Sequence, residues 1–406
     1  MTIAPDRPPP GTGRRQTEAA GPPACALVLS GGIALGAFEA GACAALEQAG
    51  GPAPGWFAGA SIGAVNAAIL AGNPPGQRIA RLREFWAMVA ADPMPVTSFW
   101  LGPPPPGGAW RRHYNRAAVL ESLLLGRPGL YRPRLPTDPE AGTAPAIFDL
   151  GPLRARLPEL VDFDRINAGG HRLTLVSTDV VSGDRVVFDT ARGTRIGPEH
   201  VVASCALLPL FAPVEIDGRL LGDGGLASNL PLDLVLDEPG ADELVCFAIE
   251  LFARPGSRPR SFAASIARAG DLAFGNQTER ILEARVRERR LHGLLDRLAD
   301  RLPAALRQDP EVAAILAEAA GGARPATVFR LGYHAAPDEA GPGKVFDFAR
   351  RTLAERWQAG EQAMHQALDR LGAPAASLAP GLVLHEIAAG PATAATPAGA
   401  AASQWR

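Results

Sequence analysis

One serine in this chain stands in a pattern that could support nucleophilic chemistry. Ser61 lies at the centre of Gly59-Ala60-Ser61-Ile62-Gly63, which has the form G-x-S-x-G. The apolar run before it and the Ala-rich run after it predict a strand, a sharp turn and a helix. A serine in such a turn presents its hydroxyl at a helix N-terminus, where the helix dipole favours developing negative charge. The same pentapeptide also fits a plain helix N-cap, so alone it does not decide between the two.

A glycine-rich loop, Ser30-Gly31-Gly32-Ile33-Ala34-Leu35-Gly36, follows an apolar run at 26–29 and opens a predicted helix. Backbone N–H groups in such a loop can bind a phosphate or the oxyanion of an acyl-transfer reaction. The dinucleotide-binding pattern G-x-G-x-x-G fails at Ile33, and the chain contains no G-x-x-x-x-G-K-[ST] loop. An oxyanion loop and a tight turn without a ligand remain as the two interpretations.

The third candidate motif is Asp223-Gly224-Gly225, which ends another apolar run. A carboxylate here could accept the proton of the Ser61 hydroxyl, and the two glycines would let other backbone segments approach closely. An Asp in an ordinary turn is the simpler alternative. Because the reference pKa of aspartate is about 3.9, this base would need burial to raise its pKa.

His334 offers a different constellation, because the order Ser61, Asp223, His334 is that of an α/β-hydrolase triad. The remaining histidines show no metal-ligand spacing, and we expect neither a metal nor a cofactor. Asn229 precedes Leu230-Pro231 and is expected to be a helix N-cap. The cysteines are far apart and predict no zinc knuckle or disulfide framework: Cys25, Cys43, Cys205 and Cys246.

Short apolar strands alternate with helices along the chain, which predicts an α/β fold around a mostly parallel sheet. Strands are expected near 26–29, 56–58, 171–181, 185–189, 214–216, 219–221 and 243–251, and helices near 36–48, 62–71, 77–91 and 201–208. After residue 260 the chain becomes helical, returns one strand at 327–333 and ends in a long helix at 345–371. The predicted division is a disordered tail at 1–23, a main domain at 24–252, a helical C-terminal extension at 253–390 and a loose tail at 391–406.

The composition excludes several classes of protein. With 406 residues, of which 47% are hydrophobic, the chain can bury a sizeable core and is not disordered throughout. Its 40 basic and 42 acidic residues give a net charge of −2, which argues against a nucleic-acid binder that neutralises phosphates. The N-terminus lacks the apolar segment of a signal peptide, and glycines interrupt the apolar stretch at 24–46. We therefore expect a cytoplasmic protein.

In this order, the three motifs resemble those of the patatin-like phospholipase family, which carries a glycine-rich oxyanion loop, a G-x-S-x-G turn and a late D-G-G or D-G-A. The resemblance spans residue 26 to beyond 370 and indicates a bacterial subgroup with a C-terminal extension. It implies a three-layer α/β/α sandwich in which the main domain is catalytic. Further stretches that match lie at 71–75, 82–86, 197–201, 228–231 and 345–348.

The resemblance implies that Ser61 is the nucleophile and Asp223 the base of a Ser–Asp dyad. Backbone N–H groups of Gly31, Gly32 and Ile33 would form the oxyanion hole. The implied reaction hydrolyses acyl esters of lipids through an acyl-serine intermediate. Ile33 stands where the family usually has a third glycine, so the alternative from another class is a weakly active or inactive lipid-binding or scaffold protein.

A lipid substrate also raises the question of contact with a membrane surface. The Pro-rich stretch at 92–110 carries Phe99, Trp100 and Trp110 and is our candidate for such contact, although these side chains could equally pack on the core. The stretch 279–301 mixes arginines with acidic residues, which is typical of a solvated helix face. We expect a protein peripheral to the membrane, and the oligomeric state stays open.

Overall fold

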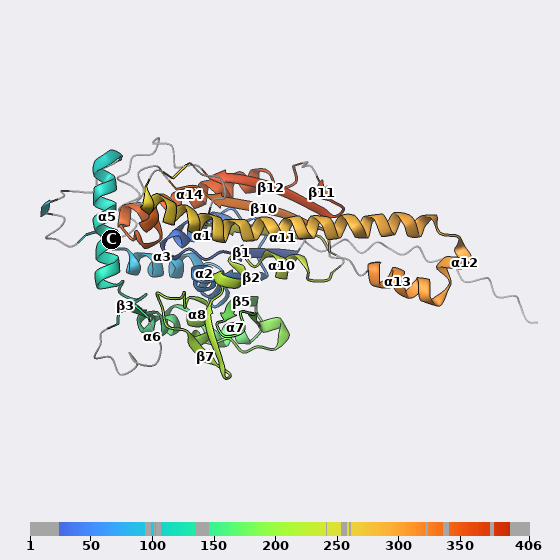
Figure 1. The fold of residues 1–406 in the computed structure, drawn as a ribbon, viewed down its shortest axis with the longest axis horizontal. Helices are drawn as coiled ribbons and strands as arrows, with labels where there is room; N and C mark the ends of the chain where they lie inside the picture. The colour runs from blue at the N-terminus through green and yellow to red at the C-terminus, as the bar shows by residue number, and fades with distance from the viewer. Residues whose placement is uncertain are drawn as a thin grey trace, which may run out of the picture.

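A ten-stranded sheet runs through the middle of the molecule, and helices cover both of its faces (Figure 1). The computed structural model describes residues 24–93, 99–100, 102, 107–134, 146–240, 242–252, 258–259, 261–320, 324–335, 341–373 and 377–389. The predicted tails at 1–23 and 391–406 lie outside the described residues.

The sheet is parallel in its middle and antiparallel at its margins. The parallel strands, in spatial order, are β12 (Leu382–Ala389), β10 (Ala326–Tyr333), β9 (Leu244–Glu250), β1 (Ala24–Leu29), β2 (Trp56–Ala60) and β5 (Arg172–Asp179). The antiparallel strands are β6 (Arg185–Asp189), β7 (Val214–Ile216), β8 (Arg219–Asp223) and β11 (Ser377–Ala379). Parallel strands that lie side by side end at the same edge of a sheet, so β1 and β2 deliver the loops that follow them to one place.

Alternating side chains of the central strands build two apolar cores, one on each face of the sheet. In β1, Leu27 and Leu29 point into the larger core, whereas Ala26 and Val28 point into the smaller one. A strand buried on both faces reads as a continuous apolar run, and this is why β1 carries no polar alternation. The three-layer α/β/α architecture is therefore confirmed.

Helices of both layers come from the main domain and from the extension. The larger core is covered by α1 (Ala37–Gln48), α2 (Ile62–Ala71), α3 (Arg78–Val89), α6 (Gly151–Leu160), α8 (Pro198–Ser204) and α14 (Arg350–Asp369). The smaller core is covered by α10 (Leu232–Leu236) and α11 (Phe262–Arg301). The other elements are α5 (Gly108–Leu125), α7 (Phe163–Asn167), α9 (Gly225–Ser228), α12 (Ala304–Arg307), α13 (Pro310–Ala320), the 3₁₀ helices η1 (Ile33–Gly36), η2 (Thr190–Arg192) and η3 (Gly341–Phe346), and a two-stranded sheet of β3 (Arg132–Pro133) and β4 (Phe148–Asp149).

Helices α1 and α14 touch through their backbones. A Cβ atom added at Gly41 would collide with the carbonyl oxygen of Trp357, and one added at Gly360 would collide with the carbonyl oxygen of Phe38. Only glycine permits an approach this close. The extension is thus packed directly on the helix that follows the glycine-rich loop.

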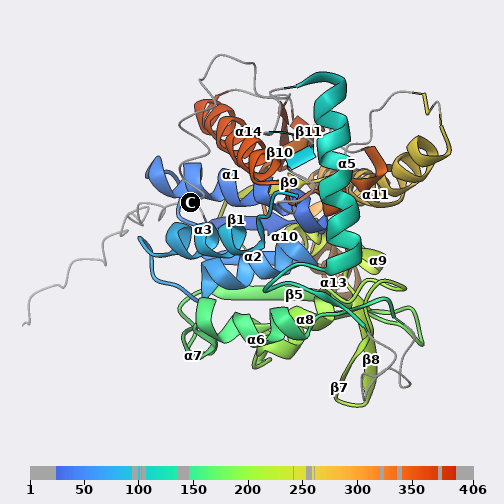
Figure 2. The same cartoon turned by 90° about the vertical axis from the view of Figure 1, so that its left-hand side faces the viewer.

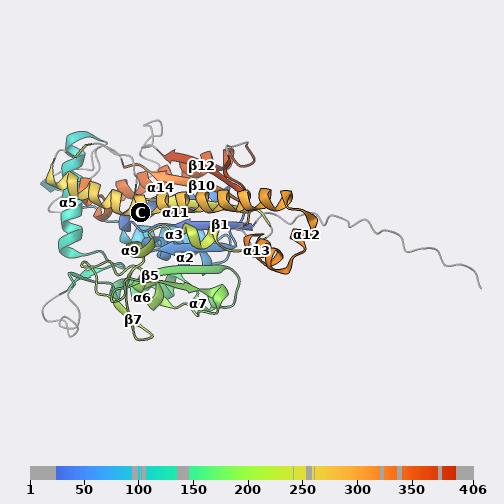
Figure 3. The ribbon, with the colours of Figure 1, turned by 45° about the vertical axis from the view of Figure 1, so that its right-hand side comes forward.

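The extension differs from the prediction in its number of strands. The sequence predicts one strand after residue 253, whereas the described residues of this region form three, because β12 pairs with β10 and β11 pairs with β12. The short run at 382–389 is a strand because β10 offers it a parallel partner along its whole length. Helix α11 runs along the sheet and continues beyond it to α12 and α13 (Figures 1 and 3). None of the helices in the described part of the chain has the length and hydropathy needed to cross a bilayer.

Candidate active site

Ser61 occupies the sharp turn between β2 and α2, as the sequence predicts. Its backbone has φ 53° and ψ −126°, a conformation that residues other than glycine rarely adopt. Two glycines make the turn possible: a Cβ atom at Gly59 would collide with the backbone of Gly63, and one at Gly63 would collide with the carbonyl of Leu29. The turn therefore holds Ser61 at the start of α2 in a strained backbone.

A second serine fixes the turn. The N–H of Ser61 donates to the hydroxyl oxygen of Ser204 over 3.0 Å, and that hydroxyl donates to the carbonyl of Val176 over 2.6 Å. Ser204 is fully buried at the end of α8. No sequence motif singles it out, because its partner atoms are backbone groups of segments far away in the chain.

Asp223, the last residue of β8, is brought to Ser61. The Ser61 side chain interacts with its carboxylate, and the N–H of Gly225 donates to Oδ1 over 2.7 Å. Burial raises the pKa of Asp223 to about 6, because desolvation of the charged form outweighs these two interactions. The fold thus brings the carboxylate at the end of β8 near Ser61.

The backbone around Asp223 is fixed by its neighbours. Strand β5 pairs with β8 so that Ser177 lies opposite Asp223, and the hydroxyl of Thr178 donates to the carbonyl of Asp223 over 2.8 Å. A Cβ atom at Gly224 would collide with the carbonyl of Val176. The glycine after the aspartate is required by this close approach.

The glycine-rich loop lies against Ser61. A Cβ atom at Gly31 would come within 2.9 Å of the Ser61 Cβ. One predicted oxyanion donor is corrected, because the Gly31 N–H is taken by Asn229, whose Oδ1 and carbonyl oxygens both lie 3.1 Å away. The hydrogen bonds of the described residues include none that takes the N–H of Gly32 or Ile33. These two amides are the remaining candidates for binding an oxyanion.

Ile33 adopts a backbone conformation that suits glycine. Its φ is 51°, in the left-handed region, which is uncommon for a β-branched residue. The side chain is half-buried and packs against the larger core. Isoleucine is thus accommodated at the position of the family's third glycine, at the cost of local backbone strain.

A buried polar network around Glu39 holds the start of the glycine-rich loop. One carboxylate oxygen of Glu39 accepts the N–H of Ser30 over 2.7 Å, and the other accepts the side-chain amide of Asn66 over 2.9 Å. The Ser30 hydroxyl accepts the N–H of Leu251 over 3.0 Å. Burial raises the pKa of Glu39 well above its ordinary value. The network ties the loop to α1, α2 and the end of β9.

Asn229 links the glycine-rich loop to the acid turn, and the N-cap prediction is wrong. Helix α10 begins after Pro231 without a side-chain cap, while the Asn229 side chain bonds Gly31. Its own N–H donates to Oε1 of Gln277 over 2.8 Å, and Nε2 of Gln277 donates to the carbonyl of Gly225 over 3.2 Å. Gln277 lies on α11, so the extension contacts both the acid turn and Asn229.

The extension also contacts the glycine-rich loop from its other side. Arg356 of α14 is buried and donates to the carbonyl of Ala34 over 3.0 Å, and to that of Lys344 over 2.8 Å. Ala34 belongs to η1, which forms the second half of the loop. Sequence reasoning missed these contacts, since a long Arg- and Glu-rich helix carries no signal of which residues reach a site.

His334 is not brought between Ser61 and Asp223. It follows β10, which is separated from β2 in the sheet by β9 and β1. The side chain and backbone groups that interact with the Asp223 carboxylate belong to Ser61 and Gly225. No cluster of side chains suited to a metal ion occurs within the described residues.

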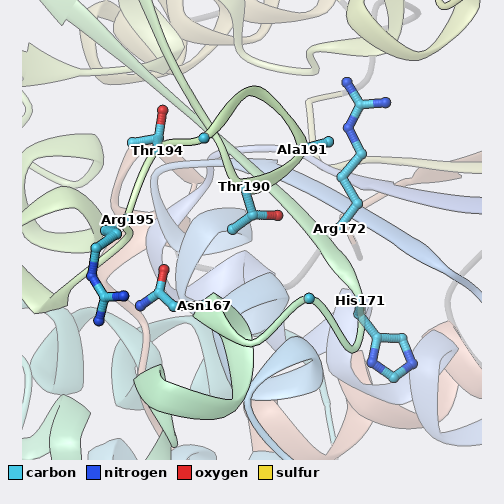
Figure 4. A pocket seen from close by; sticks show the side chains of 9 residues that line it. Asn167, His171, Arg172, Thr190, Ala191, Thr194 and Arg195 are labelled. Atoms are coloured by element: carbon cyan, nitrogen blue, oxygen red, sulfur yellow. The ribbon is translucent and has the colours of Figure 1, made fainter.

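A polar hollow of about 220 Å³ lies away from this site (Figure 4). Arg172 and Arg195 stand on its two sides, with Thr190 between them. Arg172 is already paired with Asp189 and Glu238, and the Thr190 hydroxyl accepts the N–H of Leu173. The hollow is at the beginning of β5, whereas Asp223 pairs near the end of that strand.

Comparisons with solved structures give distant similarities. The crystal structure of VipD from Legionella pneumophila matches with 14% identity and a TM-score of 0.31, covering 87% of this chain and 77% of that chain. The heterodimeric ExoU–SpcU complex from the type III secretion system of Pseudomonas aeruginosa matches with 17% identity and a TM-score of 0.27, covering 87% and 72%. Similarity this low carries no argument about function. No curated protein matches the sequence.

Comparisons with protein families are decisive for the main domain. A family model described as patatin phospholipase matches residues 272–374 of the extension. A model described as patatin-like phospholipase matches residues 27–236, which hold Ser61, Asp223 and the glycine-rich loop and amount to more than half of the chain. The chain belongs to the patatin-like phospholipase family.

Proposed function

We propose that this protein is a serine lipid-acyl hydrolase that cleaves carboxylic esters of lipids. The observation that carries the proposal is the interaction of the buried Asp223 carboxylate with Ser61, next to a loop in which the N–H groups of Gly32 and Ile33 have no acceptor among the described residues. The family match supports a lipid ester as the substrate. The roles of the individual residues below are part of the proposal.

The first half of the reaction forms an acyl-serine. Asp223 accepts the proton of the Ser61 hydroxyl as Oγ attacks the ester carbonyl carbon. The N–H groups of Gly32 and Ile33 donate to the oxyanion of the tetrahedral intermediate. When that intermediate collapses, the ester bond breaks and Asp223 returns the proton to the departing alcohol. A pKa of about 6 leaves Asp223 mostly ionised at neutral pH, yet more basic than a free carboxylate.

The second half of the reaction releases the fatty acid. Asp223 accepts a proton from a water molecule, which attacks the acyl-serine carbonyl and forms a second oxyanion in the same loop. Collapse of this intermediate breaks the bond to Oγ, and Ser61 recovers the proton. These steps need no metal and no cofactor.

The proposal extends to the setting of the reaction. The substrate is a lipid acyl ester, and we place the protein in the cytoplasm with contact to a membrane surface. We propose that residues 24–252 form the catalytic domain and that residues 253–390 form an extension that completes its scaffold. The contacts of Gln277 and Arg356 with the catalytic loops support this division of labour.

The test is ester hydrolysis by the full chain. Wild-type protein should cleave p-nitrophenyl esters of medium-chain acids, and the Ser61→Ala variant should lose the activity. A fluorophosphonate probe should label the wild type covalently and leave Ser61→Ala unlabelled. Full activity in the Ser61→Ala variant would overturn the assignment.

A second candidate function is that of an idle, lipid-binding member of the family. The strained backbone of Ile33 favours it, because a misplaced amide would weaken the oxyanion hole. The same probe separates the two functions, since a folded wild-type protein that resists labelling supports the idle form. A triad esterase with His334 is disfavoured because His334 follows β10, which β9 and β1 separate from β2 in the sheet.

A further inference from the structure

Helix α5 carries an exposed apolar stripe that the reaction does not explain. Trp110, Leu120 and Leu124 are exposed to 50%, 56% and 63% and lie on one face of the helix, and Leu125 beside them is exposed to 59%. A single exposed leucine needs no explanation, but a row along one helix marks a contact surface. We call these four residues the α5 stripe.

The opposite face of α5 is firmly attached to the protein. Arg111 forms an ion pair with Glu355 of α14, and Tyr114 and Ala118 form a small core with Ala349. The helix is therefore presented in a fixed orientation, with the α5 stripe pointing away from the body. Figure 2 shows α5 standing across the face of the molecule that is turned to the viewer.

The same end of the molecule holds the catalytic loops. A Cβ atom at Gly343 of η3 would meet Val119 of α5 at 2.6 Å, so η3 lies directly under the helix. Arg356 joins η3 to η1, because it donates to the carbonyls of Lys344 and Ala34. Only one layer of structure thus separates α5 from the glycine-rich loop.

The chemistry of α5 fits a lipid surface. Arg112 and Arg116 are exposed along one side of the stripe, and Glu121, which is half-buried, is the acidic residue of the helix. Leucines and a tryptophan with arginines at their border are typical of helices that lie in the interface of anionic membranes. Phe99 and Trp100, in the connection before α5, are exposed to 80% and 78%.

We propose that the α5 stripe docks this protein on an anionic lipid surface, with Arg112 and Arg116 on the headgroups. This inference rests on the proposed function, because a lipid hydrolase must meet its substrate in such a surface. Docking through α5 turns the catalytic end toward the bilayer, so that a lipid reaches Ser61 without leaving the interface entirely.

The distal half of α11 provides a matched control. Leu291 and Leu294 are exposed to 60% and 52% on a long helix that is also rich in arginine. They lie more than a dozen residues beyond Gln277, which at the rise of an α-helix is about 20 Å along the axis from the site. Charged substitutions there test for nonspecific effects of surface leucines.

The experiment measures binding to vesicles of non-hydrolysable diether lipids, with and without phosphatidylglycerol, by co-sedimentation of the Ser61→Ala protein. Adding Leu120→Asp and Leu124→Asp should reduce binding roughly tenfold or more. Leu291→Asp with Leu294→Asp should leave it unchanged. Arg112→Ala and Arg116→Ala should each weaken binding about fivefold on anionic vesicles and leave neutral ones unaffected.

Activity readouts separate this proposal from the proposed function. When Ser61 is intact, the protein with Leu120→Asp and Leu124→Asp should hydrolyse a soluble monomeric ester at the wild-type rate. It should hydrolyse a lipid in vesicles more slowly than the wild type. If the wild-type protein binds vesicles but has no esterase activity, the proposed hydrolase function is wrong and the docking proposal is still supported. Unchanged vesicle binding by the α5 variant, or an equal loss in the α11 control, would overturn the docking proposal. It would also be overturned if size-exclusion chromatography showed that the wild type is a dimer and that the α5 substitutions dissociate it.

Discussion

The two loops that face Ser61 are built in opposite ways. The acid turn at 223–225 is held on all sides, because its carboxylate and backbone groups are hydrogen-bonded and its glycine contacts another strand. In the glycine-rich loop, the Gly31 N–H and the Gly32 carbonyl are hydrogen-bonded, whereas the N–H groups of Gly32 and Ile33 have no acceptor among the described residues. The loop also includes the strained backbone of Ile33. A base must stay in one place, whereas an oxyanion site must keep its donors open for a transient ligand. We infer that the acid turn is rigid, and that the glycine-rich loop keeps N–H donors open for an oxyanion.

The largest effect should come from the rigid loop. Asp223→Asn keeps the shape of the side chain but removes the base, and kcat should fall by about a thousandfold. The measurement is steady-state hydrolysis of a p-nitrophenyl ester, with circular dichroism to confirm folding. Activity within tenfold of the wild type would mean that another group accepts the serine proton.

The second largest effect on kcat is expected from Asn229, which links the glycine-rich loop to the acid turn. Asn229→Ala removes the side-chain acceptor of the Gly31 N–H and leaves only the backbone carbonyl of residue 229. The start of the glycine-rich loop should loosen, and kcat should fall roughly tenfold or more with a smaller change in KM. Asn229→Asp retains an oxygen for that N–H and should recover part of the loss. Equal losses in both variants would indicate that Asn229 acts through something other than this hydrogen bond.

The protonation of Asp223 should set the acid limb of the pH profile. With a pKa of about 6, the ionised base is lost tenfold per pH unit below that value, and kcat/KM should fall accordingly. An activity profile that stays flat down to pH 5 would show that the pKa of the base is not raised.

The same raised pKa has a consequence for stability. The folded protein binds the Asp223 proton more tightly than the unfolded chain, so this group's contribution to the free energy of unfolding declines as pH rises from about 4 to 6. Above pH 6 the buried charge costs up to about 3 kcal/mol, by the usual conversion of a pKa shift. Asp223→Asn should therefore raise the Tm at pH 7 while abolishing activity, which thermal denaturation can check.

Contacts from the extension should have a moderate effect. Gln277→Met is close in size but cannot bond Asn229 or Gly225, and kcat should fall three- to tenfold as the two loops loosen. Gln366→Met on the exposed face of α14 is the matched control and should behave as the wild type. A parallel loss in both variants would point to general destabilisation.

The smallest effect is expected at Ile33. Ile33→Gly relieves the strained φ but removes a half-buried side chain from the larger core and makes the unfolded chain more flexible. The free energy of unfolding should therefore fall by about 1 to 2 kcal/mol. The oxyanion hole needs only the N–H, which glycine also supplies, and kcat should stay within about threefold. A large increase in kcat would show that the isoleucine side chain obstructs the site.

The sequence was informative where function depends on local backbone geometry. The G-x-S-x-G pattern predicts the strained turn of Ser61, because the collision at Gly59 arises within the same strand–turn–helix unit. The close approach of Gly63 to Leu29 joins two distant segments, and the pattern alone does not show it. The pairing with Asp223 followed from the family resemblance. The apolar runs likewise predict the central strands, each of which is buried on both faces.

The rest depended on contacts between distant segments, which a single sequence does not reveal. The glycine pattern does not show that Asn229 takes the Gly31 amide, since that bond joins residues 198 positions apart. Strands β11 and β12 exist because β10 is there to pair with them. The Pro-rich stretch at 92–110 drew attention to its aromatic residues but gave no sign of the helix that starts at Gly108.

The backbone contact between α1 and α14 bears on how the enzyme is made. Gly41 emerges from the ribosome long before Trp357, the residue whose carbonyl it must meet. A nascent chain therefore has α1 without its cover, and the loop above it without the support of Arg356. These contacts with α1 and the glycine-rich loop can form only after residues 350–369 of α14 have been synthesised.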